Sequence, residues 1–383
     1  MTQRRQKNAL VVLAGLTLAA LGVYNIVLKA TWTLMDDGVF WKGARQGLVA
    51  ARIDPGGPGS RAGIEAGDVL LAIDGQEVLT RADLETSLAS RRPGDQALYK
   101  LLREDQRRLL DVPVEPLPKG DVSGFYYLSL VGFFSLVVGT VVMLRRPAER
   151  STLHFYAICV LFFLAYSISY TGKLDVADWG LFWVDSMARL FLPVVFLHFC
   201  LTFPERRLRA QRLWLVPALY MPALVLAGAV AMSQALGAAG EGTGALWGIV
   251  EAIDRFQPLY FAAFFAMAFA ALRDSYRRTR SLTARRQVKW LVWGTGGGVV
   301  PFLAFYALPF AIGREPGLAM KLAGYVPLAL IPLSLAYAVV KHRLMDVELI
   351  VRRALGFVLA VAVLVAAALL TAGLTDVLWE EPG

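Results

Sequence analysis

Nine apolar stretches, each about as long as a membrane-spanning helix, constrain the fold of this chain more than any other feature. A hydrocarbon core of about 30 Å is crossed by about 20 helical residues, at about 1.5 Å per residue. The stretches are Ala9–Leu28, Gly124–Leu144, Thr152–Tyr170, Gly180–Phe203, Leu213–Leu236, Arg255–Leu272, Val288–Ile312, Leu322–Val340 and Ala354–Thr375. Because 57% of the residues are hydrophobic and only 18% are charged, a simple soluble enzyme is excluded. We expect a mainly α-helical polytopic membrane protein with about nine transmembrane helices.

The Lys and Arg residues of the short loops predict the orientation of these helices. With the N-terminus inside, 21 of them lie on the cytoplasmic side, within 4–7, 145–150, 206–212, 273–289 and 341–353, and four lie opposite. This bias accounts for the net charge of +9, so no nucleic-acid partner is expected. We therefore predict a multi-pass protein of a bacterial cytoplasmic membrane, with the lipid bilayer as a partner.

Four segments follow from this topology. Residues 1–31 are predicted as a cytoplasmic N-terminus and anchor helix, 32–118 as an extracytoplasmic domain, 119–375 as an eight-helix bundle, and 376–383 as an extracytoplasmic tail. Within 32–118 the pattern predicts a small α+β fold. It comprises strands at Leu48–Ile53, Val69–Ile73, Ala97–Arg103 and Arg108–Val114, a tight turn at Asp74-Gly75, and an amphipathic helix at Arg81–Ser90.

The run DPGGPGSRAGIEAGDVLLAIDG, which starts at Asp54, resembles a segment of bacterial HtrA-type PDZ domains, and the resemblance covers about Asp37–Leu117. It implies that an extended peptide, often a C-terminus, binds as an added strand between a β-strand and the long helix. The implied groove residues are Leu48, Val49 and Ala50 on the strand, Leu84 and Leu88 on the helix, and Gly38, Val39 and Phe40 in the carboxylate-binding loop. For the apolar residues of this set, the competing interpretation is that they pack in the core of the domain.

Three polar residues inside one apolar stretch are candidates for function, because charge within a span is costly. Asp185 and Arg189, four residues apart, either line an outward-facing ligand cavity or form an internal ion pair that fixes helix packing. His198 is expected as a neutral side chain hydrogen-bonded between helices. The glycine run from Gly294 to Pro301 predicts close helix contact or a kink.

The stretches LHFCLTFPERR, RRQVKWLVWGT and PLSLAYAVVKHRLMDVELIVRRAL resemble the multi-span sensor region of ComP-type bacterial histidine kinases, and some SpoIIE-type phosphatases carry similar regions. The resemblance implies a sensor module of a two-component system that binds a peptide or protein signal outside and relays it inward. It also implies a homodimer and a cytoplasmic response regulator. No phospho-accepting His box is present, so the given chain is not expected to be an enzyme. We expect a truncated piece of a longer receptor rather than a protein that consists of the sensor alone.

Two other classes of function remain as alternatives. One is a membrane scaffold that recruits proteins through the PDZ domain, and the other is an intramembrane protease. A zinc protease needs an H-E-x-x-H motif, which none of His154, His198 and His342 provides. No metal and no cofactor are therefore expected.

Overall fold

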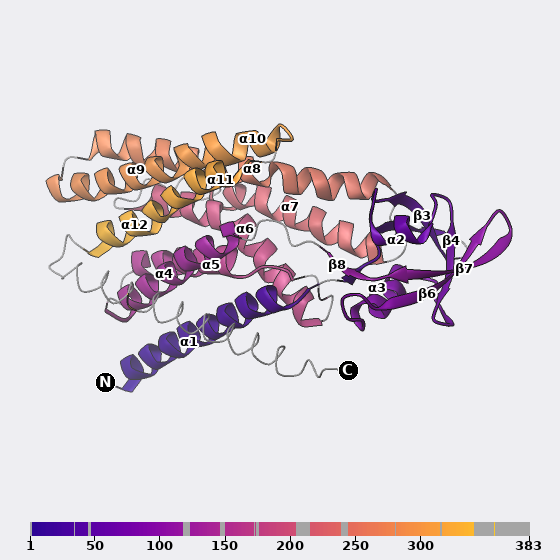
Figure 1. Cartoon of the computed structure of the whole chain (residues 1–383). Helices are drawn as coiled ribbons and strands as arrows, with labels where there is room; N and C mark the ends of the chain where they lie inside the picture. Colours follow the sequence, from indigo (N-terminus) through magenta and orange to yellow (C-terminus); the bar gives the residue numbers. More distant parts are fainter. Residues whose placement is uncertain are drawn as a thin grey trace. The chain divides into compact units, whose positions relative to one another are not determined.

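The chain divides into two units, each described here by itself. The computed structural model describes residues 2–33, 35–44, 47–117, 123–145, 150–171, 173, 176–203, 215–238, 244–279, 281–314, 316–340 and 356. A helical unit comprises Met1–Thr31, Asp121–Thr171 and Asp175–Gly383, and an α+β unit comprises Trp32–Gly120 and Gly172–Leu174. Figure 1 labels most of their helices and several of their strands.

The helical unit is built from long helices and a few short ones. They are α1 (Thr2–Thr31), α4 (Ser123–Arg145), α5 (Arg150–Ser167), α6 (Val176–Thr202), α7 (Leu215–Ala238), α8 (Gly244–Arg278), α9 (Leu282–Phe302), η2 (Leu303–Ala307), α10 (Leu308–Ala311), α11 (Leu318–Tyr325), η3 (Val326–Ala329) and α12 (Leu330–Val340). Consecutive helices pack side by side, α4 on α5, α5 on α6 and α8 on α9, and α12 returns to pack on α9.

Seven helices of the described residues are long and apolar enough to cross a membrane, fewer than the nine predicted. They are Arg5–Thr31, Gly124–Arg145, Val176–Thr202, Leu215–Ala235, Phe256–Arg278, Arg285–Ala311 and Leu318–Leu335. The predicted span at Thr152–Tyr170 is shorter, because α5 ends at Ser167. Beyond it, the side chain of Asn25 hydrogen-bonds both the N–H and the C=O of Ser169, at 3.0 and 2.8 Å. The stretch 354–375 lies outside the described residues apart from residue 356.

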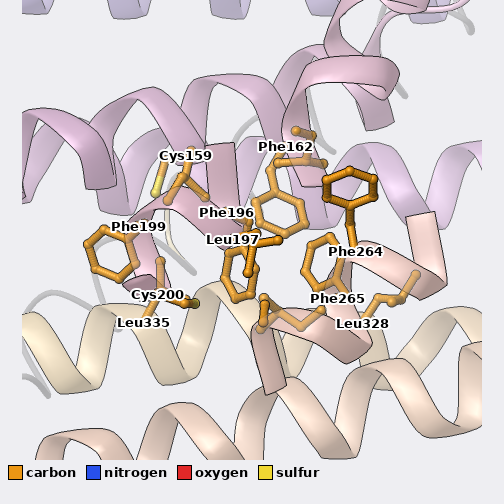
Figure 2. Close-up of a cluster of buried hydrophobic side chains, with 14 of the residues drawn as sticks. Cys159, Phe162, Phe196, Leu197, Phe199, Cys200, Phe264, Phe265, Leu328 and Leu335 are labelled. Carbon is orange, nitrogen blue, oxygen red and sulfur yellow. The ribbon is translucent and has the colours of Figure 1, made fainter. Parts of the chain in front are cut away.

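Aromatic side chains fill the core of the helical unit. Figure 2 shows Phe162, Phe196 and Phe265 packed together between the helices. The rings of Phe196 and Phe265 stack at 4.5 Å and 15°, and Phe162 meets Phe265 edge-on at 6.4 Å. All three side chains are fully buried. These contacts tie α5, α6 and α8 into one packed body.

The glycine run of α9 lies against α12, as the sequence predicts. A Cβ built on Gly294 would lie 1.9 Å from Oγ of Ser334 and 2.8 Å from the backbone oxygen of Leu330. A Cβ on Gly298 would lie 2.9 Å from Ile331. No larger side chain fits at these two positions without separating the helices, so the run is a packing surface.

The α+β unit is a small twisted sheet with two helices. The strands are β1 (Met35–Asp36), β2 (Val39–Ala44), β3 (Gly47–Ile53), β4 (Val69–Ile73), β5 (Gln76–Glu77), β6 (Gln96–Arg103), β7 (Gln106–Pro113) and β8 (Glu115–Pro116), and the helices are α2 (Pro58–Ala62) and α3 (Arg81–Ala89). The main sheet has the order β2-β3-β4-β6-β7 and is antiparallel throughout. Its core comprises Leu48, Leu70, Ile73, Tyr99 and Leu101, each 1% exposed or less.

Tight turns set the register of this sheet. Asp74 and Gly75 both have positive φ, 49° and 82°, and they join β4 to β5 as predicted. Glu104 and Asp105, at 48° and 61°, form a two-residue hairpin in which Arg103 faces Gln106. The predicted strands and helix of this region are therefore present, with ends that differ by one or two residues.

Candidate functional site

Strand β2 is one of the two edge strands of the main sheet, and β7 is the other, which changes the predicted groove. Strand β3, which holds Leu48, Val49 and Ala50, is paired with β2 on one side and with β4 on the other. Its backbone cannot accept an added strand, and Leu48 and Ala50 are 1% exposed core residues. The prediction that these three residues pair with a peptide is wrong for this reason. Among the described residues, no strand pairs with β2 on the side away from β3, so β2 is an edge strand at which a further strand could be added.

Helix α3 packs against β2 and forms the other side of this edge. It begins with a capping box, in which the side chain of Thr80 accepts from the N–H of Asp83 and the carboxylate of Asp83 accepts from the N–H of Thr80. That hydrogen bond from the Thr80 backbone lowers the pKa of Asp83. Leu84 and Leu88, each 5% exposed, point into the core of the unit. Their role in positioning α3 beside β2 is shown, and a direct peptide contact by them stays a prediction.

The loop at the start of β2 is occupied by its own carboxylates. Gly38 has a φ of +69°, and a Cβ there would lie 2.9 Å from Pro58, so only glycine fits. Its N–H donates to Oδ2 of Asp36 at 3.1 Å, and the N–H of Val39 donates to Oδ1 of Asp37 at 3.0 Å. A backbone loop captures a terminal carboxylate with free N–H groups. The N–H groups of Gly38 and Val39 are already used, and two negative charges lie beside them.

Asp37 is a buried hydrogen-bond hub that the sequence analysis did not identify. Besides the N–H of Val39, its carboxylate accepts the indole N–H of Trp41 and the hydroxyl of Tyr99, each at 2.8 Å. Asp37 is 1% exposed, and burial raises its pKa to about 6 although these hydrogen bonds favour the ionised form. Burial and the charge of Asp37 raise the pKa of Tyr99. The only signal in the sequence is an acidic residue directly before a strand that carries Trp41.

Phe40 is the exposed residue of this loop. Its ring is 44% exposed, and the guanidinium of Arg52 on the neighbouring strand lies 5.8 Å from the ring centroid. Val39 and Trp41 are 7% and 5% exposed and belong to the core. Of the predicted loop residues, Phe40 is therefore the one with a large exposed apolar side chain.

A charge network fixes the opposite side of the domain. Arg103 on β6 donates from Nε and Nη2 to the two oxygens of Asp68, both at 2.6 Å, and from Nη1 to Glu65 at 2.6 Å. Its Nη2 also donates to the carbonyl oxygen of Gly63 at 2.7 Å. Burial opposes ionisation of Asp68, but the hydrogen bonds from Arg103 and from the N–H of Glu65 outweigh it and lower the pKa of Asp68. The network holds the loop after α2 to the sheet.

In the helical unit, Asp185 and Arg189 pair along α6 as the sequence predicts. Nε of Arg189 lies 2.5 Å from Oδ1 of Asp185. Arg189 also lines a cavity of about 380 Å³ within this unit. The ion pair is therefore present, and Arg189, though not Asp185, is among the residues that line the cavity. That this cavity faces outward and takes a ligand stays a prediction.

His198 lies apart from that pair. Its Nδ1 lies 3.0 Å from the hydroxyl of Tyr220, and its ring meets that of His154 edge-on at 5.2 Å. These contacts join α5, α6 and α7, in line with a hydrogen-bonded histidine between helices. In the part of the chain that the structure describes, no group of three or more His, Cys, Asp or Glu residues could hold a metal ion.

Comparison with known proteins identifies the α+β unit. Residues 21–114 match the PDZ domain family model. A probable periplasmic serine endoprotease DegP-like of Pseudomonas fulva is 33% identical over 75 residues, which is 20% of this chain and 16% of that protein. The corresponding protein of Halomonas elongata is 38% identical over 73 residues, 19% of this chain and 15% of that protein. The chain thus spans about one sixth of the curated relatives it matches.

Solved structures are similar over the same part of the chain. The HtrA-type protease AlgW with decapeptide is 28% identical, with a TM-score of 0.22, and the match covers 23% of this chain and 31% of that chain. The serine endoprotease from Yersinia pestis is 25% identical, with a TM-score of 0.20, over 21% of this chain and 28% of that chain.

These relatives correct one prediction. The sequence predicts no enzyme, whereas the matched proteins are named serine endoproteases. Because the similarity is confined to the PDZ region, about one fifth of this chain, it leaves the enzymatic status of the whole chain uncertain.

Proposed function

We propose that the PDZ domain binds an extended peptide segment by strand addition to β2, beside α3. The observation that supports this most is the position of β2 as an edge strand of the described sheet, next to a helix that packs on the same strand. An added strand obtains its affinity from main-chain hydrogen bonds, and side-chain contacts on alternate residues give it specificity. Phe40 supplies an exposed apolar surface for such a contact.

The loop carboxylates favour a segment without a free terminal carboxylate. Asp36 and Asp37 occupy the N–H groups of Gly38 and Val39, and a third carboxylate there would meet two like charges. We propose an internal segment of a protein, or an amidated peptide, as the preferred ligand class.

The test measures binding of two peptide libraries to the full chain. The libraries have the same sequences, but one has amidated C-termini and the other has free C-terminal carboxylates. We expect selected amidated peptides to bind about tenfold more tightly than their carboxylate forms, because like charges juxtaposed at an interface oppose binding. Asp36→Ala should selectively improve binding of the carboxylate forms, since it releases the N–H of Gly38 and removes one charge.

Hydrogen exchange locates the binding edge. Bound peptide should protect amides of β2 and leave those of β7, the opposite edge of the same sheet, unchanged. Protection of β7 alone, or equal affinity for both peptide forms in the parent and in Asp36→Ala, would contradict the proposal.

For the whole chain, we propose a membrane-embedded sensor module with its PDZ domain outside the cytoplasm. Seven helices of sufficient length and apolarity support insertion, and the Lys and Arg bias supports the orientation. Impermeant reagents that label the PDZ domain on intact cells would check that side of the membrane. We also propose that this module passes its signal to a two-component system.

A sensor and a scaffold differ in one measurement. If the chain is a sensor, a peptide selected on the PDZ domain should change hydrogen exchange in α6 and α9 of the helical unit, because the signal must alter the population of helix packings. A scaffold would show protection in the PDZ domain alone. The measurement requires the full chain in a bilayer disc, with a scrambled peptide as control.

A further inference from the structure

The helical unit contains a cavity whose wall combines one arginine, one buried hydroxyl and a set of aromatic rings. Its volume of about 380 Å³ falls within the range of small-molecule sites, about 300–1,000 Å³. Its wall includes Tyr166, Arg189, Phe302, Tyr306, Phe310 and Tyr325. We propose that it binds an amphipathic anion with a flat, unsaturated body, whose acidic head meets Arg189. This site is independent of peptide binding by the PDZ domain.

Arg189 has hydrogen-bonding capacity left after its contact with Asp185. Only its Nε is engaged by that carboxylate, at 2.5 Å, and among the described residues its two Nη groups have no hydrogen-bond partner. The side chain is 42% exposed, and it lines the cavity. A guanidinium presents five N–H donors and binds a carboxylate or phosphate through two of them at once. The Nη groups therefore supply the recognition element for an anionic head.

Tyr166 provides a second polar group on the same wall. The residue is 8% exposed, and its hydroxyl has no hydrogen-bond partner among the described residues. An unpaired buried hydroxyl costs free energy, and a ligand oxygen in the cavity would satisfy it. Arg189 and Tyr166 thus supply two polar groups to one cavity, whose wall is otherwise mostly apolar and aromatic and also includes Gln257.

The remainder of the wall is suited to a flat body. The ring of Tyr306 lies 4.8 Å from Tyr325, 5.5 Å from Phe302 and 5.7 Å from Phe310, with an angle of only 7° to the last. Aromatic rings prefer offset-stacked or edge-to-face partners at such distances. A planar unsaturated body can therefore continue the array already present.

Tyr306 lies on a π-helical segment, η2, which follows Pro301 of α9. Such segments are rare and occur often at functional sites. Here the segment supplies a ring of the cavity wall, which links the helix irregularity to the proposed site.

A second ion pair of the helical unit provides a matched control. Asp274 and Arg278 have the same spacing of four residues and the same Nε–Oδ1 contact, at 2.8 Å. Arg278 is 79% exposed and is not part of the cavity wall. A ligand effect seen at Arg189 and not at Arg278 therefore reports on the cavity.

The experiment measures binding of naphthalene-2-acetate to the full chain in discs of neutral phosphatidylcholine, with naphthalene-2-ethanol as the uncharged analogue. We expect saturable binding of the acetate, weakened about 10- to 100-fold by Arg189→Gln and unchanged by Arg278→Gln, because a charge-assisted hydrogen bond is lost. Binding of the ethanol should be weak and insensitive to both substitutions. Equal binding of the acetate to the parent and to a folded Arg189→Gln chain overturns the proposal.

Tyr166→Phe keeps the proposal testable if Arg189→Gln fails to fold. It removes a hydroxyl without a partner among the described residues, so the fold should persist, and acetate affinity should fall about three- to tenfold. Unchanged affinity in this variant counts against the site.

Adding phosphatidylglycerol to the discs separates two sources of the anion. Competition with the acetate would assign the acidic head at Arg189 to a lipid and overturn the flat body of the proposed ligand, whereas lack of competition would support a free amphipathic anion.

Discussion

Between about pH 4 and about pH 7 the PDZ domain is expected to lose about 3 kcal/mol of stability through Asp37 alone. Its pKa is about 6 in the folded chain and about 3.9 when unfolded. Because the folded state holds the proton more tightly, this stabilisation is complete below about pH 4 and is lost as the pH rises through about 6. The shift of about two pKa units corresponds to about 3 kcal/mol, as an order of magnitude.

The measurement is hydrogen exchange of the full chain, corrected for intrinsic rates, read on amides of β4 and β6. The comparison variant is Asp37→Asn, which cannot titrate. The stability difference between parent and variant should shrink by about 3 kcal/mol from pH 4 to pH 7. Subtracting the variant is necessary because Asp68, with its lowered pKa, contributes the opposite trend and loses stabilisation as the pH falls. A difference independent of pH would show that Asp37 keeps an ordinary pKa.

Replacing Arg103 by Met should destabilise the PDZ domain by about 3–5 kcal/mol. Asp68 is 1% exposed, so removal of its bidentate partner leaves a buried carboxylate without its countercharge. The carbonyl of Gly63 and the carboxylate of Glu65 lose a donor in the same step. Chemical denaturation, with hydrogen exchange of the amides of β6 and β7 as the readout, measures the loss of stability.

Arg61→Met is the matched control for that substitution. Arg61 pairs with Glu115, but both side chains are about half exposed, 49% and 48%. An exposed pair contributes about 0–1 kcal/mol, because solvent screens it. If the two substitutions cost the same, the burial of Asp68 is not the cause of the effect.

The strands and turns of the PDZ domain were predictable because their signals are local. Asp74-Gly75 predicts a tight hairpin through its positive φ angles, and the structure has both. The alternation of apolar residues in Ala97–Arg103 likewise predicts a half-buried strand. The peptide edge was not predictable in this way, because periodicity shows which residues form a strand and not which strand lies at the edge of a sheet. The groove was therefore assigned to β3 instead of β2.

The polar residues of the helical unit show the same division. The spacing of Asp185 and Arg189 is enough to predict an ion pair, since i and i+4 lie on one face of a helix. That Arg189 also borders a cavity depends on rings from α9, η2, α10 and α11, more than a hundred residues later in the chain. The predicted count of nine spans is not confirmed, because seven helices of the described residues are long and apolar enough and the stretch 354–375 lies outside them apart from residue 356. The hydrogen bonds of Asn25 to Ser169, which follows α5, join residues 144 positions apart and could not be read from the local sequence.

By itself, the sequence determined the apolar helices, the charge bias of the loops and the presence of a PDZ domain, because these depend on composition, length and local turn chemistry. Only the tertiary structure decided that β2 is an edge strand, that Asp36 and Asp37 accept the N–H groups of the loop before it, and that Arg189 lines a cavity. The physical reason is that strand order, burial and cavity walls are set by contacts between residues far apart in the chain.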